Sequence, residues 1–143
     1  MDTSGKPVLQ ILEDYKAAVF AKDLESFVAL YDDDVQVFDM WDTWEYRGIA
    51  AWRTMVAGWF DSLGDARDVV EFSDAEATVT QDLAVIHAFV KYQRATAEGD
   101  IVQWLDSRMT MVLKLGSDGW KVIHEHTSSP VAHETLKVML QRG

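Results

Sequence analysis

The stretch GSDGWKVIHEHTSSP, residues 116–130, is the most informative segment of the chain. Its GSDG turn leads into a mostly apolar run that stops at Pro130, a pattern typical of a strand entered through a tight hairpin. His124, Glu125 and His126 stand in succession on this run. They could bind a metal, act as a catalytic acid with its helpers, or face another surface, and the rest of the chain is needed to choose.

Alternation along a strand sends neighbouring side chains to opposite faces of the sheet. The two histidines therefore point away from Glu125, so this segment alone does not build a three-ligand metal site. The spacing also differs from that of zinc-binding histidines on a helix, because Ser128 stands four residues after His124. Metal binding would need a ligand from elsewhere, and we favour hydrogen bonding on the outer face or at a subunit contact. The predicted faces are Trp120, Val122, His124 and His126 on one side, and Ile123, Glu125 and Thr127 on the other.

The composition indicates one globular domain, residues 1–143, with 48% hydrophobic residues to build a core. The chain has 24 acidic and 13 basic side chains, and its formal charge of −11 would repel the phosphates of nucleic acid. No apolar segment has signal-peptide character, and no run approaches the roughly 20 apolar residues of a membrane span. We therefore expect a cytoplasmic protein with no nucleic-acid or membrane partner. The absence of cysteine excludes disulfides, thiolate nucleophiles and sulfur-based zinc sites.

Apolar periodicity predicts helices first and an antiparallel meander afterwards. Helical spacing covers two segments near 7–19 and 24–31, and a third helix begins near Ile49 and ends at Gly64. A short strand follows the DDD turn at 32–34, and residues 41–48 form an irregular aromatic hairpin. Four further strands are expected near 67–80, 83–96, 101–115 and 119–128. Helices on one face of a curved sheet give an α+β fold, shaped as a cone with a cavity at its open end.

Two motifs in this order of elements carry a family resemblance. They are FDMWDTWEYRG at residues 38–48 and DGWKVIHEHTSSP at 118–130. The chain resembles the SnoaL-like branch of the nuclear transport factor 2-like superfamily, which includes ketosteroid isomerase, polyketide cyclases and the association domain of calcium/calmodulin-dependent protein kinase. The resemblance covers nearly the whole chain and implies a cystatin-like α+β barrel. It identifies the fold better than the activity, because this fold hosts several chemistries.

The methionine face of the strand near 101–115 is expected to point inward. Resemblance to the kinase association domain places Met111 and Thr127 at its pocket, which implies that Glu125 is inward while His124 and His126 face outward. Parity on the strand near 83–96 leaves His87 outside as well. Trp104 is out of phase with the methionines, so it is either a subunit-contact residue or displaced by a bulge.

Two carboxyl groups are candidate catalytic bases. An inward Glu125 would be desolvated, and its raised pKa would suit proton transfer near neutral pH. The alternative is a structural carboxylate that is hydrogen-bonded or paired with an arginine. Asp39 follows Val35 and Val37 in strand phase and would also face the cavity, unless it serves as a turn or cap residue. The arginines considered as partners of Glu125 are Arg47, Arg53 and Arg94.

An excess of aromatic side chains predicts a cavity for a small, compact apolar ligand, with no cofactor and no metal. Some of these aromatics belong to the core, because aromatic residues at helical spacing usually pack there. No phosphate loop, nucleophile elbow or dinucleotide fingerprint is present. The residues expected to contact a ligand are Trp41, Tyr46, Trp52, Met55, Trp59, Tyr92, Met109, Met111 and Thr127.

Two functions remain open at this stage. One is an isomerase, cyclase or hydrolase of the SnoaL type that uses Asp39 or Glu125 as a general base. The other is a noncatalytic ligand-binding or oligomerisation module like the kinase association domain. A tyrosine and protonated-acid pair cannot be placed from the sequence, so ketosteroid isomerase activity itself is not indicated. We also expect a homodimer, as in many relatives, formed through the outward set Arg108, Thr110, His124 and His126.

Overall fold

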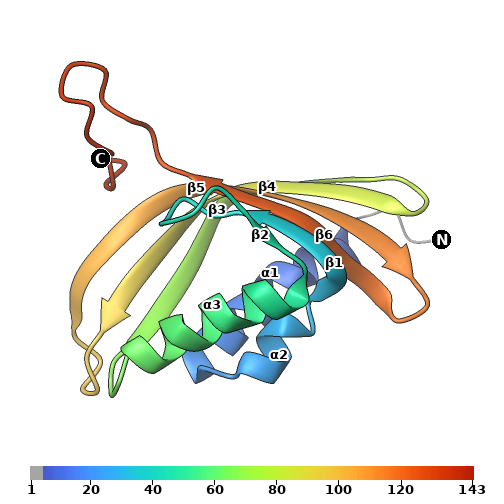
Figure 1. Cartoon of the computed structure of the whole chain (residues 1–143), viewed down its shortest axis with the longest axis horizontal. Helices are drawn as coiled ribbons and strands as arrows, with labels where there is room; N and C mark the ends of the chain where they lie inside the picture. Colours follow the sequence, from blue (N-terminus) through green and yellow to red (C-terminus); the bar gives the residue numbers. More distant parts are fainter. Residues whose placement is uncertain (1–4) are drawn as a thin grey trace.

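A six-stranded sheet arches over three helices, which cover its concave face (Figure 1). The computed structural model describes residues 5–143. The helices are α1 (Lys6–Ala21), α2 (Leu24–Val28) and α3 (Ile49–Ser62). The strands are β1 (Tyr31–Phe38), β2 (Tyr46–Arg47), β3 (Arg67–Val79), β4 (Leu83–Ala95), β5 (Ile101–Gly116) and β6 (Gly119–Ser128). These bounds lie close to the predicted ones, except that Tyr31, expected on the second helix, and residues 32–34, expected as a turn, belong to β1.

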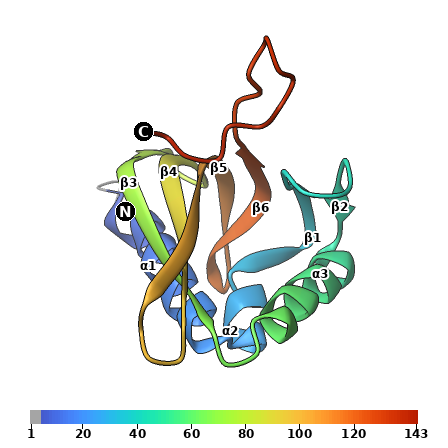
Figure 2. The same ribbon diagram turned by 90° about the vertical axis from the view of Figure 1, so that its left-hand side faces the viewer.

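The strand order is β2-β1-β6-β5-β4-β3, and β3 to β6 form the predicted antiparallel meander. β1 pairs antiparallel with β2 on one side and parallel with β6 on the other. This pairing places Val37 beside Glu125 and Phe38 beside His126, so the ends of the two strands lie together. The α+β class and the curved sheet around N-terminal helices are confirmed. The sheet stays open, because its edge strands β2 and β3 do not pair within residues 5–143 (Figure 2).

A bulge in β6 changes which side chains face the core. Val112 pairs with His124 and Leu113 pairs with Val122, so Ile123 is an extra residue on β6. One extra residue reverses the alternation, and Val122 and Glu125 both point inward, with exposed fractions of 0% and 1%. The prediction that placed Val122 on the face of the two histidines is therefore wrong. Glu125 and Thr127 are both buried, as the resemblance implied.

The helices present aromatic side chains to the concave face of the sheet. Tyr15, on the apolar face of α1, is 2% exposed and packs against Phe27 of α2 with ring centroids 4.9 Å apart. Trp52, near the start of α3, is equally buried. Gly48 precedes α3 with φ +86°, a conformation that favours glycine and lets the chain turn from β2 into the helix. The concave face is therefore rich in aromatic surface.

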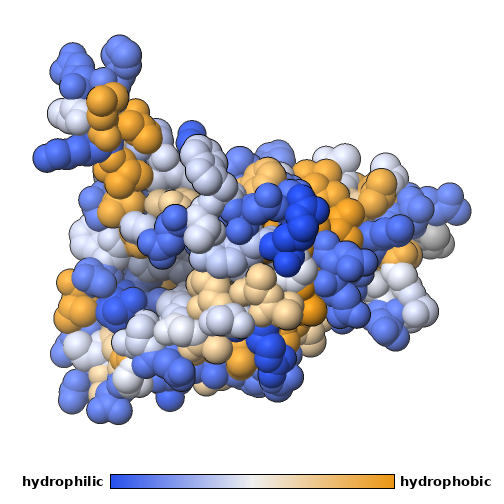
Figure 3. Space-filling model, viewed as in Figure 1, coloured by the Kyte–Doolittle hydropathy of each residue, from blue (hydrophilic) through white to orange (hydrophobic). Residues whose placement is uncertain are grey.

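An arm formed by residues after β6 projects from the sheet (Figure 3). Val131 and Val138 bridge to each other, and the carbonyl of Leu140 then accepts a hydrogen bond of 2.6 Å from the Asp106 amide of β5. Several apolar side chains on this arm are exposed, with Leu136 at 77%. The sequence did not predict the arm. Across residues 5–143, no helix is long and apolar enough to cross a membrane.

Candidate functional site

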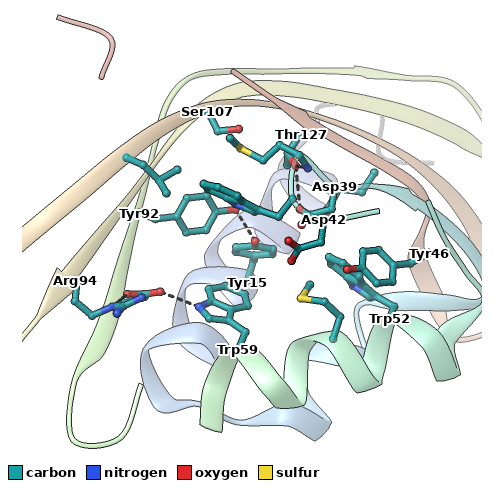
Figure 4. A pocket seen from close by; sticks show the side chains of 16 residues that line it. Tyr15, Asp39, Asp42, Tyr46, Trp52, Trp59, Tyr92, Arg94, Ser107 and Thr127 are labelled. Atoms are coloured by element: carbon teal, nitrogen blue, oxygen red, sulfur yellow. Dashed lines mark hydrogen bonds and ion pairs between the residues drawn. The ribbon is translucent and has the colours of Figure 1, made fainter. Parts of the chain in front are cut away.

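A cavity of about 430 Å³ lies between the concave face of the sheet and the helices (Figure 4). Its walls come from α1, α3, the segment after β1, and strands β2 to β6. Six aromatic rings line it: Tyr15, Trp41, Tyr46, Trp52, Trp59 and Tyr92. The polar side chains in the lining are Asp39, Asp42, Asp68, Arg94, Ser107, Glu125 and Thr127. The cavity is thus mostly apolar, with carboxyl groups at several points.

Most of the predicted site residues line this cavity. They are Asp39, Trp41, Tyr46, Trp52, Met55, Trp59, Tyr92, Glu125 and Thr127. Met109 and Met111 do not line it, because they are buried in the core beside Thr127 and Glu125, with exposed fractions of 3% and 1%. The expectation that these two methionines contact a ligand is therefore not supported.

Glu125 is a fully buried acid held by a tyrosine. The Tyr31 hydroxyl donates to its Oε1 at 2.5 Å. Burial raises the pKa of Glu125 to about 8, an effect that the Tyr31 hydrogen bond opposes and the nearby Asp39 charge reinforces. The arginine partners considered from the sequence bind elsewhere: Arg47 pairs with Glu45, Arg53 with Glu25, and Arg94 with Asp68. Among the described residues, Glu125 therefore has no basic partner.

Asp39 directly follows the end of β1, and its side chain contacts Thr127, two residues after Glu125 on the neighbouring strand β6. It continues the inward phase of Val37 beyond the end of β1, and the Thr127 hydroxyl donates to its Oδ1 at 3.1 Å. Thr127 in turn accepts a hydrogen bond of 3.2 Å from the Met40 amide. Burial raises the pKa of Asp39, and the Thr127 hydrogen bond and the Trp41 and Met40 amides partly oppose this rise. Asp39 therefore faces the cavity and also stabilises the turn, so both sequence interpretations apply.

Two tyrosine hydroxyls meet at the cavity surface. Tyr15 of α1 and Tyr92 of β4 are hydrogen-bonded at 2.7 Å, as Figure 4 shows. Burial raises the pKa of both phenols well above the usual range, so both stay protonated at neutral pH. One hydroxyl donates to the other, and the accepting tyrosine keeps its own hydrogen for a ligand. The helical spacing of the segment near 7–19 puts Tyr15 among the apolar positions of the first helix, and nothing local in the sequence distinguishes a core tyrosine from a cavity tyrosine.

A polar cluster forms the side of the cavity nearest Trp59. Asp68 accepts one hydrogen bond from Trp59 Nε1 at 2.8 Å and another from Arg94 Nε at 2.7 Å. The Asp68 side chain is 7% exposed and that of Arg94 is 32% exposed. Sequence analysis missed Asp68, although its inward phase with the buried Val70 was a usable signal.

One buried donor in the lining lacks a partner. Trp52 Nε1–H makes no hydrogen bond of acceptable geometry within residues 5–143. It lies near enough to the Tyr31 hydroxyl to oppose the rise in the pKa of that tyrosine, which burial and Glu125 cause. Buried N–H groups are usually satisfied, so an acceptor in the cavity would find a donor here.

The two histidines of β6 lie outside the cavity. His124 Nδ1 is hydrogen-bonded to the Gln36 carbonyl at 2.9 Å, and Phe38 packs edge-on against both imidazole rings. Trp104 of β5 is also outward, 47% exposed, with the Lys91 ammonium 5.4 Å from its ring centroid. Within residues 5–143, no three His, Asp or Glu side chains gather closely enough to hold a metal ion.

Comparison with known proteins identifies the family of this domain. A family model for the SnoaL-like domain matches residues 8–132. A nuclear transport factor 2-like protein of unknown function from Pseudomonas putida has a TM-score of 0.87 at 25% identity, covering 100% of this chain and 99% of that one. A search of curated proteins finds no significant match.

Two more distant structures share the fold alone. A candidate dehydratase of the nuclear transport factor 2-like family from Streptomyces avermitilis has a TM-score of 0.74 at 17% identity, covering 92% of this chain and 99% of that one. A candidate calcium/calmodulin-dependent protein kinase II association domain from Xanthomonas campestris has a TM-score of 0.72 at 15% identity, covering 89% and 88%. These likenesses confirm the fold that the two sequence motifs indicated.

Proposed function

The chain belongs to the SnoaL-like domain family, and we propose that it is an acid–base enzyme that moves a proton on a small, compact, largely apolar substrate. The observation that carries the proposal is the pair of carboxyl groups, Asp39 and Glu125, in one aromatic cavity without a basic partner among the described residues. Two carboxyl groups in different environments can hold different protonation states at one pH, which separates the base from the acid.

Asp39 is the base in this proposal. Its carboxylate accepts a hydrogen bond from Thr127 and lies at the cavity surface, where it reaches a substrate carbon. Glu125, with a pKa of about 8, is mostly protonated at pH 7. A neutral Glu125 adds no second negative charge to the cavity when the substrate becomes anionic.

The substrate class follows from the donors that face Asp39 across the cavity. A carbonyl oxygen can accept a hydrogen bond from the Tyr15 and Tyr92 pair while Asp39 removes a proton from the adjacent carbon. The electron pair of that C–H bond forms an enolate, whose oxygen the tyrosine hydroxyl stabilises. Where the ketone has a β,γ double bond, the enolate is a dienolate, and return of the proton from Asp39 to its γ carbon completes an isomerisation. Where the β carbon carries a hydroxyl group, the enolate electrons form the new C=C bond as that group leaves as water with the proton from Asp39, which completes a dehydration.

Hydrogen–deuterium exchange tests the proposal without knowledge of the natural substrate. Small cyclic ketones such as 1-tetralone and 2-cyclohexenone are incubated with the protein in D₂O, and NMR follows exchange next to the carbonyl. We expect accelerated exchange with the wild type and a loss of roughly 100-fold or more with Asp39→Asn, as for removal of a general base. The exposed Asp65→Asn is the matched control and should keep the wild-type rate. An Asp39→Asn variant that exchanges like the wild type would disprove the assignment.

The alternative is a noncatalytic ligand-binding or oligomerisation module. The arm after β6, with its exposed apolar side chains, supports an interaction role, and the Xanthomonas campestris domain has this fold. Tight binding of ketones without any acceleration of exchange over the protein-free solution would support this alternative.

A further inference from the structure

Among residues 5–143, Arg94 is the one basic side chain in the cavity lining, and the reaction proposed above does not use it. It stands directly opposite Asp68 in the β3–β4 register, and its Nε–H is held by Asp68 Oδ1 at 2.7 Å. Trp59 Nε1 binds the other Asp68 oxygen, so the Asp68 carboxylate is occupied on both sides. Contact through Nε alone leaves the two terminal nitrogens of the guanidinium without a hydrogen bond to the described residues.

The position of Arg94 relative to the tyrosine pair determines how far apart the two acceptor atoms of a bound ligand must be. Tyr92 and Arg94 are two residues apart on β4 and both line the cavity. Side chains on the same face of a strand are separated by about 7 Å along the strand. In Figure 4, Arg94 and Trp59 lie on one side of the cavity, and Tyr46 and Trp52 lie on the other. A ligand that contacts both donors therefore carries two acceptors on opposite ends of a small apolar body.

The local charge decides which acceptor fits beside Arg94. Asp68 already balances the arginine charge at hydrogen-bonding distance. The same cavity also contains the carboxyl groups of Asp39 and Asp42. A ligand carboxylate would gain little net attraction and would lose its hydration, whereas a neutral oxygen needs only a donor.

We propose that Arg94, held by Asp68, forms a second polar subsite for a neutral oxygen acceptor at the end of the substrate away from the reacting carbonyl. The substrate class is therefore a compact, uncharged molecule with two oxygen acceptors separated by an apolar ring. This inference rests on the proposed function for the location of the reacting end. The Arg94 subsite itself is defined by binding alone.

Three probes that differ at one end test the subsite. They are 1,4-diacetylbenzene, 4-ethylacetophenone, which lacks the second oxygen, and 4-acetylbenzoate, which carries a charge there. Isothermal titration calorimetry at pH 7 measures the dissociation constants with the full chain. We expect the diacetyl compound to bind the wild type at least about fivefold more tightly than either of the others, the effect of one net hydrogen bond.

Substitution of the ion pair separates the subsite from the rest of the cavity. The double variant Asp68→Asn/Arg94→Met removes both charges together and so leaves no unpaired buried carboxylate. In this variant the affinities of the two neutral probes should agree within about twofold, since only the net hydrogen bond has been lost. Arg108→Met, on the outer face of β5, is the matched control and should keep the wild-type preference.

The outcomes separate the subsite from the proposed reaction. Equal binding of the two neutral probes to the wild type, a preference that survives in the double variant, tightest binding of 4-acetylbenzoate, or no binding of any probe would each overturn the subsite. The same titrations with Asp39→Asn need no turnover. A preference that persists while ketone exchange is absent in the wild type would refute the reaction and retain the subsite.

Discussion

Replacing Glu125 by glutamine removes a titrating group and keeps the shape of the side chain. Glu125 is 1% exposed and accepts a hydrogen bond from the Tyr31 hydroxyl. The amide oxygen of glutamine can accept the same bond, so the fold should survive the change. The amide N–H₂ then needs an acceptor in the core, and its absence costs about 1 to 3 kcal/mol at every pH.

The size of the effect follows from how the ionisation of Glu125 makes the free energy of unfolding depend on pH. Burial raises the pKa of Glu125 from its ordinary value of 4.5 to about 8. Between these two values the folded state binds a proton that the unfolded state has released, so the free energy of unfolding falls as the pH rises. The difference of about 3.5 pH units, at about 1.4 kcal/mol for each, corresponds to roughly 5 kcal/mol across this range. Glutamine contributes no such slope.

Urea unfolding at pH 5, 7 and 9 measures this effect for both proteins. At pH 5, Glu125→Gln should be less stable than the wild type, and the order should reverse by pH 9. The exposed Glu98→Gln is the matched control, and its stability should follow that of the wild type. If the difference between Glu125→Gln and the wild type stays constant within about 0.5 kcal/mol from pH 5 to pH 9, as for a surface change, the reasoning about a buried, unpaired acid is refuted.

Further predictions concern the tyrosine pair, the outer face of the sheet and metal. Tyr15→Phe removes one hydroxyl of the pair and should slow ketone exchange by about 10-fold to 100-fold with a stability loss of about 1 kcal/mol, measured by NMR and thermal melting. The outward face around Arg108 and His126 should make the protein a homodimer at micromolar concentration, and a monomer in sedimentation velocity would contradict this. Protein purified without added metal should contain only trace zinc, iron and manganese, whereas stoichiometric metal that His124→Ala abolishes would disprove the prediction.

The sequence predicted the elements well because each is dictated by local patterns. Apolar spacing and turn residues located the meander to within a few residues at each end, since GSDG and similar turns interrupt β-branched runs. The inward position of Glu125 came from the family resemblance and not from alternation. Alternation alone would have put Val122 outside, because a bulge at Ile123 has no local signature.

The partners inside the cavity depend on contacts between distant segments. Arg94 binds Asp68 and not Glu125 because the register of β3 and β4 places Asp68 and Arg94 opposite each other. Tyr31 reaches Glu125 across 94 positions of sequence. Such pairings depend on how the strands align in space. Reasoning from a single sequence therefore identified candidate residues for the cavity but not the contacts between their side chains.

The last prediction concerns deletion of the bulge residue Ile123. It tests whether the bulge, or the contacts made by Val122 and Glu125, sets the inward orientation of Glu125. Val122 is anchored by its amide, which donates to the Leu30 carbonyl at 2.9 Å, and Glu125 is anchored by Tyr31. Without Ile123, Val122 and Glu125 would be two residues apart, and regular alternation would keep both inward. We therefore expect deletion of Ile123 to cost about 1 to 2 kcal/mol, the lost burial of a partly buried side chain, and to preserve the pH dependence of stability. If the deletion protein instead shows the flat pH dependence expected for Glu125→Gln, the glutamate has turned outward, and the bulge rather than the anchoring contacts sets the orientation of the acid.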